Sequence, residues 1–114
     1  MADKDLVWLR GAIKSPPFST EARRTAGYLL RLLQQGHPLA MPDARPMPQI
    51  APRCHELRVR DAPLRITWRV VLRIDDDALV IGDVFAKKTP QTPQTVITAC
   101  RLRFAQYDAS AQGD

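Results

Sequence analysis

One segment constrains the fold of this chain more than any other. Residues 64–75, LRITWRVVLRID, alternate apolar and basic side chains with a period of two. One set of alternate positions is apolar: Ile66, Trp68, Val70, Leu72 and Ile74. The other set is mostly basic: Arg65, Thr67, Arg69, Val71 and Arg73. Because successive side chains of a β-strand point to opposite faces of the sheet, the segment predicts a long strand with one apolar and one basic face.

Two neighbouring segments extend this strand into a sheet. Residues 54–60, CHELRVR, place His55, Leu57 and Val59 on one face and Glu56, Arg58 and Arg60 on the other. Residues 79–86 are mostly apolar on both faces, as expected of a central strand. Short connections between the three predict an antiparallel meander, and residues 5–8 are a candidate for a short edge strand.

Helical spacing appears before and after the sheet. In residues 19–35 apolar side chains recur at helical intervals, with Ser19 suited to the N-cap and Gly36 to the end. A second helix is expected to start at Thr92–Pro93, with Thr92 as its N-cap, and the tail 109–114 is expected to be disordered. Residues 37–52 hold five prolines, so we expect a loop without regular structure there.

These elements predict a single α+β domain over residues 1–114. It has a helical N-terminal part, a three- or four-stranded antiparallel sheet and a C-terminal helix. Neither a signal peptide nor a run long enough to span a membrane is evident, so we expect a cytoplasmic protein with Cys54 and Cys100 reduced and buried. The cysteines and histidines lack zinc-ligand spacing, and no metal or cofactor is expected.

The charge distribution leaves two interpretations of the basic face open. The net charge is +5, with a pI of about 9.8, which favours an anionic partner such as nucleic acid, an acidic protein or a membrane surface. Arginines concentrate on one predicted sheet face: Arg58, Arg60, Arg65, Arg69 and Arg73. This face either remains solvated and discourages edge pairing, or it binds a polyanion. We favour the polyanion, since the arginine fork suits phosphate and unpaired cross-strand arginines repel one another.

The segment VFAKKTPQTP, residues 84–93, suggests a phosphate site. Lys87, Lys88 and the hydroxyls of Thr89 and Thr92 lie just before the last helix, whose free N–H groups favour anions. The alternative is an exposed strand end followed by an ordinary helix cap. No nucleophilic triad or glycine-rich phosphate loop is present. His55 and Glu56 are possible bases, although a core histidine and an arginine partner are the more common roles.

One kind of chemistry needs little more than such a basic face. RNA carries its own nucleophile, the 2′-hydroxyl. A protein that orients this hydroxyl and stabilises the charged transition state with cationic groups gains rate by positioning and electrostatics.

Six fragments, in order, resemble a known family. They are KSPPFSTEAR, LLRLLQQG, ARPMPQI, CHELRV, TWRVVLRID and VFAKKTPQTP. From about Val7 to Tyr107 the chain is similar to phage-derived HigB-like toxins of the RelE/ParE superfamily. The resemblance implies the toxin of a type II toxin–antitoxin pair, with two N-terminal helices packed on a twisted antiparallel sheet. RelE- and HigB-like members cleave mRNA, usually in the ribosomal A site, whereas ParE-like members inhibit DNA gyrase.

The resemblance also implies roles for particular residues. Arg58 matches a basic sheet residue of RelE-like toxins, and Arg69 matches the arginine usually placed at the scissile phosphate. Lys87 and Lys88 fall where a basic residue follows the last strand. Further contacts to nucleic acid are expected from Arg60, Arg65, Arg73, Thr89 and Thr92. The implied partners are mRNA on the ribosome and an antitoxin, with a helix-turn-helix protein from an adjacent gene expected. A gyrase inhibitor or a non-toxic nucleic-acid-binding module remains the alternative.

Overall fold

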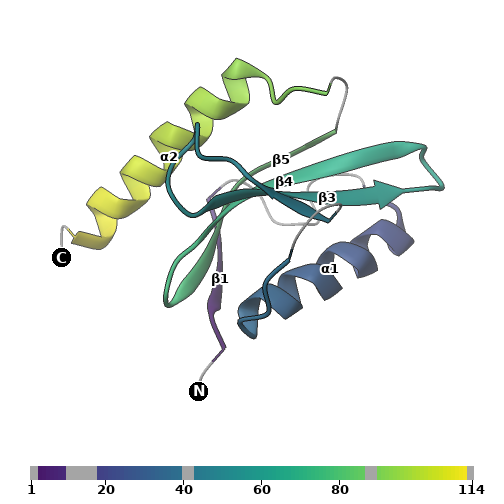
Figure 1. The fold of residues 1–114 in the computed structure, drawn as a ribbon, viewed down its shortest axis with the longest axis horizontal. Helices are drawn as coiled ribbons and strands as arrows, with labels where there is room; N and C mark the ends of the chain where they lie inside the picture. Colours follow the sequence, from purple (N-terminus) through teal and green to yellow (C-terminus); the bar gives the residue numbers. More distant parts are fainter. Residues whose placement is uncertain (1–2, 10–17, 40–42, 87–89, 113–114) are drawn as a thin grey trace.

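The computed structural model describes residues 3–9, 18–39, 43–86 and 90–112, and it has a central β-sheet with a helix on each face (Figure 1). The strands are β1 (Asp5–Trp8), β2 (Ala44–Pro46), β3 (Cys54–Asp61), β4 (Ile66–Ile74) and β5 (Ala78–Ala86). The helices are α1 (Thr20–Gln34) and α2 (Gln94–Gln112). Within these residues no helix is both long and apolar enough to cross a membrane.

The sheet is mixed and five-stranded, in the order β1-β5-β4-β3-β2. The antiparallel meander of β3, β4 and β5 is confirmed, and so is the edge strand at residues 5–8. The predicted three- or four-stranded, wholly antiparallel sheet is wrong, because β1 pairs with β5 in parallel and β2 adds a fifth strand. β2 lies inside the proline-rich segment 37–52, which we expected to be a loop. Proline is tolerated there because β2 is an edge strand and Pro46 is its last residue.

Helix α1 forms where its sequence pattern predicts. The Ser19 hydroxyl caps it by accepting a hydrogen bond from Ala22 N at 3.1 Å, and an apolar stripe is buried against the sheet. The described residues before β2 contain this one helix, not the two N-terminal helices that the family resemblance implied. At α2 the predicted cap is displaced: the carbonyl of Pro93 accepts from Ile97 N at 3.2 Å, and the helix begins at Gln94. α2 then continues through Gln112, into the tail for which disorder was expected.

Both faces of the sheet are covered, which corrects the expectation of a solvated basic face. One apolar cluster lies between α1 and the sheet, and it includes Leu57, Val70 and Leu72. A second lies on the face that carries the arginines and contains Val71, Val80, Cys100 and Phe104. α2 packs on this second face because β5 is apolar on both sides and Val71 interrupts the basic positions of β4.

Glycine at position 82 allows α2 to approach β5 closely. A register irregularity in the β4–β5 pairing places Val71 opposite Asp83 but Leu72 opposite Ile81, so Gly82 is the extra residue. A Cβ atom at Gly82 would lie only 2.9 Å from Phe104 Cζ. The Gly82 carbonyl also accepts a hydrogen bond from Arg103 Nη1 at 2.8 Å. These contacts fix the height of α2 above the sheet.

Two free cysteines and one aspartate are also buried in the core. Cys54 and Cys100 are free and buried, as predicted, and burial raises the pKa of their thiols to about 11 and about 12. Asp61 is also buried, and it accepts hydrogen bonds from Ser19 N at 3.0 Å and Trp68 Nε1 at 2.9 Å. Burial opposes its ionised form, but the hydrogen bonds outweigh burial and lower the pKa of the Asp61 carboxyl. Asp61 therefore joins the start of α1 to the β3–β4 hairpin.

Candidate anion-binding site

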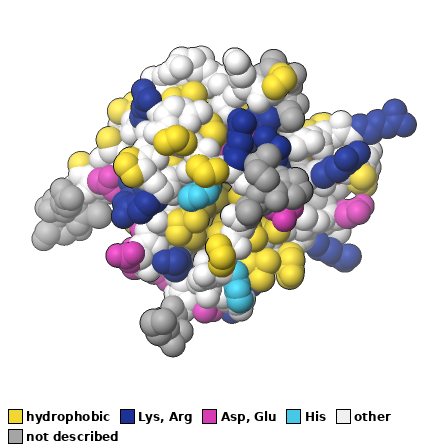
Figure 2. Space-filling model, in the orientation of Figure 1, with side chains coloured by type: hydrophobic (Ala, Val, Ile, Leu, Met, Phe, Trp, Pro, Cys, Tyr) yellow, Lys and Arg dark blue, Asp and Glu magenta, His cyan; other side chains and the backbone are white. Residues whose placement is uncertain are grey.

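Charged and polar side chains from four parts of the chain converge on the α2 side of the sheet. They form what we call the arginine cluster: Arg45, Glu56, Arg58, Arg69 and Thr92. The sheet register brings most of them together, since Arg45 pairs with Glu56 across β2 and β3, and Arg58 pairs with Arg69 across β3 and β4. Thr92 arrives from the segment that precedes α2. Figure 2 shows a compact group of Lys and Arg side chains below the start of α2, and others spread over the β3–β4 hairpin.

Glu56 lies at the centre of the arginine cluster and is completely buried. Its Oε1 atom is 2.8 Å from Arg69 Nη1 and 3.2 Å from Arg45 Nε, which are ion-pair distances without good hydrogen-bond angles. Its Oε2 atom accepts a hydrogen bond from the Thr92 hydroxyl at 2.6 Å. Glu56 thus holds two arginines and the segment before α2 in fixed positions.

The described residues do not supply a hydrogen-bond partner for every donor of the cluster's arginines. Arg69 is completely buried, and its Nη2 donates to the carbonyl of Pro90 in a long hydrogen bond of 3.4 Å. The Nε atoms of Arg58 and Arg69 are buried without a hydrogen-bond partner among the described residues. Leaving a buried donor unpaired costs about 1–3 kcal/mol, and more for a charged group. Two such donors lie on the cross-strand pair Arg58 and Arg69, without a hydrogen bond from the described residues.

The charge of the arginine cluster also favours an anion. Arg45 and Arg69 pair with the Glu56 carboxylate, and Arg58 adds a third guanidinium beside Arg69, so the described side chains of the cluster carry a net charge of +2. Burial lowers the pKa of Arg69, Glu56 opposes this, and the neighbouring Arg45 and Arg58 lower the pKa further. A guanidinium remains protonated at neutral pH in spite of such shifts. The site therefore holds excess positive charge in a place with little water to screen it.

Arg60 and Arg65, both predicted to bind nucleic acid, lie at the end of the β3–β4 hairpin and are exposed. Arg65 has a positive φ of 55° in the turn before β4, so it does not share the strand face of Arg69 as we expected. Together with Thr67, these arginines line a separate open depression of about 340 Å³. Arg60 lies two residues along β3 from Arg58, on the same face.

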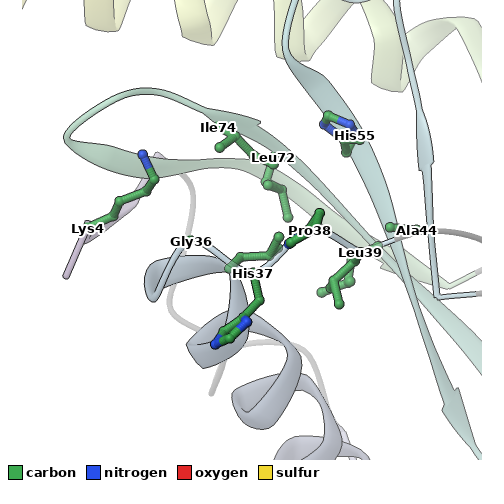
Figure 3. Close-up of a pocket in the computed structure, with 11 residues that line it drawn as sticks. Lys4, Gly36, His37, Pro38, Leu39, Ala44, His55, Leu72 and Ile74 are labelled. Atoms are coloured by element: carbon green, nitrogen blue, oxygen red, sulfur yellow. The ribbon is translucent and has the colours of Figure 1, made fainter.

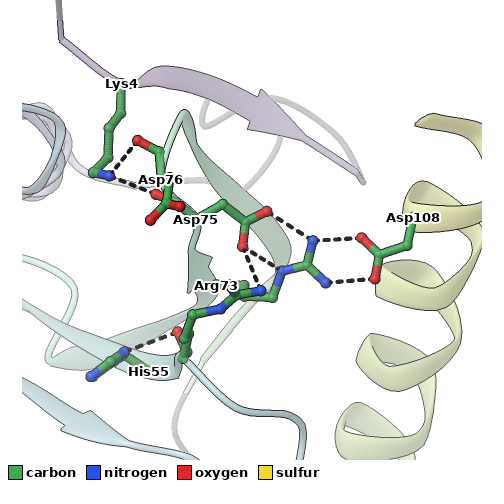
Figure 4. A network of polar contacts seen from close by, with 7 residues as sticks. Lys4, His55, Arg73, Asp75, Asp76 and Asp108 are labelled. Atoms are coloured by element: carbon green, nitrogen blue, oxygen red, sulfur yellow. Dashed lines mark hydrogen bonds and ion pairs between the residues drawn. The ribbon is translucent and has the colours of Figure 1, made fainter. Parts of the chain in front are cut away.

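Arg73 lies on the sheet face for which solvent or a polyanion was expected, but it is covered by the protein itself. It is buried, and its guanidinium donates to both carboxylate oxygens of Asp75 and of Asp108 at 2.7–3.0 Å (Figure 4). The guanidinium also lies 5.2 Å from the centre of the Phe104 ring. The hydrogen bonds that Arg73 donates to Asp108 raise the pKa of Arg73 above its usual value. Arg73 thereby attaches the C-terminal half of α2 to β4.

The two candidate bases lie on opposite faces of the sheet. Glu56 belongs to the arginine cluster, whereas His55 lines a mostly apolar cavity of about 320 Å³ between α1 and the sheet, with Lys4 and His37 (Figure 3). His55 Nδ1 is 3.2 Å from the carbonyl oxygen of Arg53. Lys87, Lys88 and Thr89 lie outside the described residues. In the part of the chain that the structure describes, no group of three or more His, Cys, Asp or Glu side chains is arranged to hold a metal ion.

Arg45 is the residue of the cluster that sequence reasoning missed. It lies among the prolines of residues 37–52, where no local pattern predicts a strand. Its position follows only from the pairing of β2 with β3, which sets it opposite Glu56. Its spacing from Glu56 in the sequence carries no signal that would have found it.

The comparison with protein families adds an independent result. Residues 17–105 match the model described as phage derived protein Gp49-like (DUF891), a range that includes every residue of the arginine cluster. Among curated proteins, no sequence matches the chain. The Gp49-like family is associated with RelE- and HigB-like toxins, which agrees with the general part of the resemblance described above. The chain belongs to the Gp49-like family of phage-derived proteins.

Proposed function

We propose that the chain is the toxin of a type II toxin–antitoxin pair and that it cleaves mRNA on the ribosome in the cytoplasm. The observation that carries this proposal is the arginine cluster. The Nε atoms of Arg58 and Arg69 are buried there without a hydrogen bond from the described residues, and Arg69 also pairs with the buried Glu56 carboxylate. The family association with toxins supports the biological role. The arginine cluster supports the chemistry.

The proposed reaction uses the 2′-hydroxyl of the RNA as nucleophile. The 2′-oxygen forms a bond to phosphorus and loses its proton, while the bond from phosphorus to the 5′-oxygen breaks and that oxygen gains a proton. As the 2′-oxygen attacks, the negative charge on the phosphoryl group rises from one to two. A site with a net charge of +2 matches the transition state better than the substrate, and only such differential stabilisation raises the rate.

We assign separate roles to the members of the cluster. Arg58 and Arg69 bind the non-bridging oxygens through their Nε donors, which no described residue engages in a hydrogen bond. Arg45 approaches the same group from the open side, since about 29% of its side chain is exposed. Glu56 positions these arginines; we do not assign it as the base, because its oxygens are already held by three partners.

Other predicted contacts extend the proposal along the RNA. Arg60 and Arg65 would bind the backbone beside the scissile phosphate, because they are exposed on the same hairpin. Lys87 and Lys88 would add charge next to Thr92, as the family resemblance implies. An antitoxin from an adjacent gene would keep the toxin silent by covering the basic face or a helix.

The test is induced expression followed by mapping of RNA ends. Expression should halt translation and leave mRNA ends within codons. Replacing Arg69 by Ala, or the more exposed Arg45 by Gln, should slow cleavage by about 10²–10³-fold, as for loss of one group that stabilises transition-state charge. Arg24→Gln removes an exposed charge from α1, on the other face of the sheet, and should leave cleavage unchanged. Intact messages together with DNA breaks would instead indicate a gyrase inhibitor.

A further inference from the structure

We infer that the arginine cluster binds a terminal phosphate with two negative charges in preference to an internal phosphodiester with one. The inference rests on the site used in the proposed function, but it concerns the affinity for a bound ligand and not the rate of cleavage. Its ligand class is a phosphomonoester, such as the 3′-phosphate end of an RNA.

The first argument is charge balance. The described side chains of the cluster carry +2, and both Glu56 and Arg69 are completely buried. A doubly charged phosphate neutralises this excess, whereas a phosphodiester leaves one positive charge uncompensated. Because buried and partly buried charges are screened weakly, the difference between the two ligands is larger here than on an open surface.

The second argument is the number of hydrogen-bond donors. Arg58 and Arg69 each have a buried Nε atom that finds no hydrogen-bond partner in the described part of the chain, and Arg45 belongs to the same cluster with part of its side chain exposed. A phosphomonoester has three free oxygens, one for each of the three guanidiniums. A phosphodiester has only two, because its other oxygens bridge to sugars. Charge-assisted bonds of this kind are about twice as strong as neutral ones.

This preference has a consequence for the proposed cleavage. Attack by a 2′-hydroxyl leaves a 2′,3′-cyclic phosphate with one negative charge. Addition of water across one of its P–O bonds gives a 3′-phosphate, which carries close to two charges at neutral pH. The site would therefore hold the hydrolysed end more tightly than the uncut chain, and that end would act as an inhibitor.

The experiment is calorimetric titration of the full chain at low ionic strength. The probes are uridine 3′-phosphate, its methyl ester (a phosphodiester), inorganic phosphate and sulfate. At pH 7.5 uridine 3′-phosphate should bind at least tenfold more tightly than the methyl ester. Inorganic phosphate should also bind more tightly than the methyl ester, because the cluster is inferred to recognise the doubly charged phosphate group itself.

Lowering the pH tests whether affinity depends on the charge of the ligand, because the phosphomonoester loses a charge and sulfate does not. A phosphomonoester loses its second charge near pH 6, so affinity should fall about tenfold between pH 7.5 and pH 5. Sulfate remains doubly charged and should change by less than twofold. The charged groups that face the site from β2, β3 and β4 are Arg45, Glu56, Arg58 and Arg69. His55 does not face the site, because it lines the cavity on the opposite face of the sheet.

Variants of the cluster residues test whether uridine 3′-phosphate binds at the arginine cluster. Arg45→Gln and Arg58→Gln should each weaken uridine 3′-phosphate about tenfold. Glu56→Gln should strengthen it, because the net charge rises from +2 to +3. Arg24→Gln, which removes an exposed charge on α1, should change affinity by less than twofold. If Glu56→Gln does not fold, the Arg45→Gln and Arg58→Gln variants, which change half-buried side chains, show whether the phosphate binds at the cluster.

Equal binding of the ester and the monophosphate, or unchanged binding in both Arg45→Gln and Arg58→Gln, would overturn the inference. Failure of the proposed function looks different. A protein that cleaves mRNA but shows no preference for the monophosphate refutes the inference alone. One that prefers the monophosphate but leaves mRNA intact refutes the cleavage proposal alone.

Discussion

Replacing Glu56 with Gln should destabilise the protein strongly. Glu56 is completely buried, lies 2.8 Å from Arg69 Nη1 and accepts a 2.6 Å hydrogen bond from Thr92. The amide keeps the shape of the side chain but removes the only carboxylate that faces the three arginines among the described residues. Removing one partner of a buried ion pair costs about 3–5 kcal/mol, because the remaining charge is left uncompensated.

Urea denaturation in a buffer of low ionic strength measures this cost. Urea is uncharged, so it does not screen the arginines, whereas guanidinium chloride would. The midpoint should fall without a change in slope, since the slope follows the surface exposed on unfolding. Added sulfate should restore part of the loss, because a ligand that binds only the native state stabilises it by RT ln(1 + [L]/Kd).

A double variant provides the control. In Glu56→Gln combined with Arg69→Met, the apolar side chain no longer needs a counter-charge. The pair should therefore cost less than the sum of the two single changes. A loss below about 1 kcal/mol for Glu56→Gln, the value typical of an exposed pair, would refute the view that the cluster is poorly screened. A loss that sulfate does not reduce would refute the link to anion binding.

Three further perturbations test the packing of α2 and the hairpin. Gly82→Ala should cost about 1–3 kcal/mol by urea denaturation, because the new Cβ meets Phe104 at 2.9 Å. Asp108→Asn should weaken attachment of the end of α2, measured as faster amide exchange in its last turns, because Arg73 loses a charged partner. Acid should also destabilise the fold. The pKa values of Asp61 and Asp108 are lowered in the folded protein. Their contribution to the free energy of unfolding is therefore complete above about pH 3.9, and it is lost as the pH falls through their pKa values in the folded state. In Asp61→Asn, the free energy of unfolding should fall less steeply as the pH is lowered.

The fold was predictable where local patterns decide it. The period of α1, its Ser19 cap and the alternation of β4 all follow from neighbouring residues, and each forms as expected. The pairing of β2 was not predictable, because three residues between prolines gain a strand only from β3 beside them. The parallel pairing of β1 with β5 depends in the same way on distant residues.

The candidate site was predictable in part for the same reason. Alternation placed Arg58 and Arg69 on one face, and the register sets them directly opposite each other. It could not show that α2 would cover this face, since the apolar stripe of a helix does not specify where it packs. Burial of Arg73 therefore came as a correction. Thr92 was found for the wrong reason, because its hydroxyl binds Glu56 instead of capping α2.

The pairing of β1 with β5 has a consequence for how the sheet folds during synthesis of the chain. β1 is made before β2, β3 and β4, yet its partner residues, from Ala78 to Ile81, are made only after them. Lys4, just before β1, likewise bonds to the carbonyl oxygens of Asp75 and Asp76. Closing so long a loop is slow, and until it closes the outer edge of β5 exposes unpaired N–H and C=O groups. A newly made chain thus offers a strand-binding edge for a short time, and the completed fold covers this edge with β1 of the same chain.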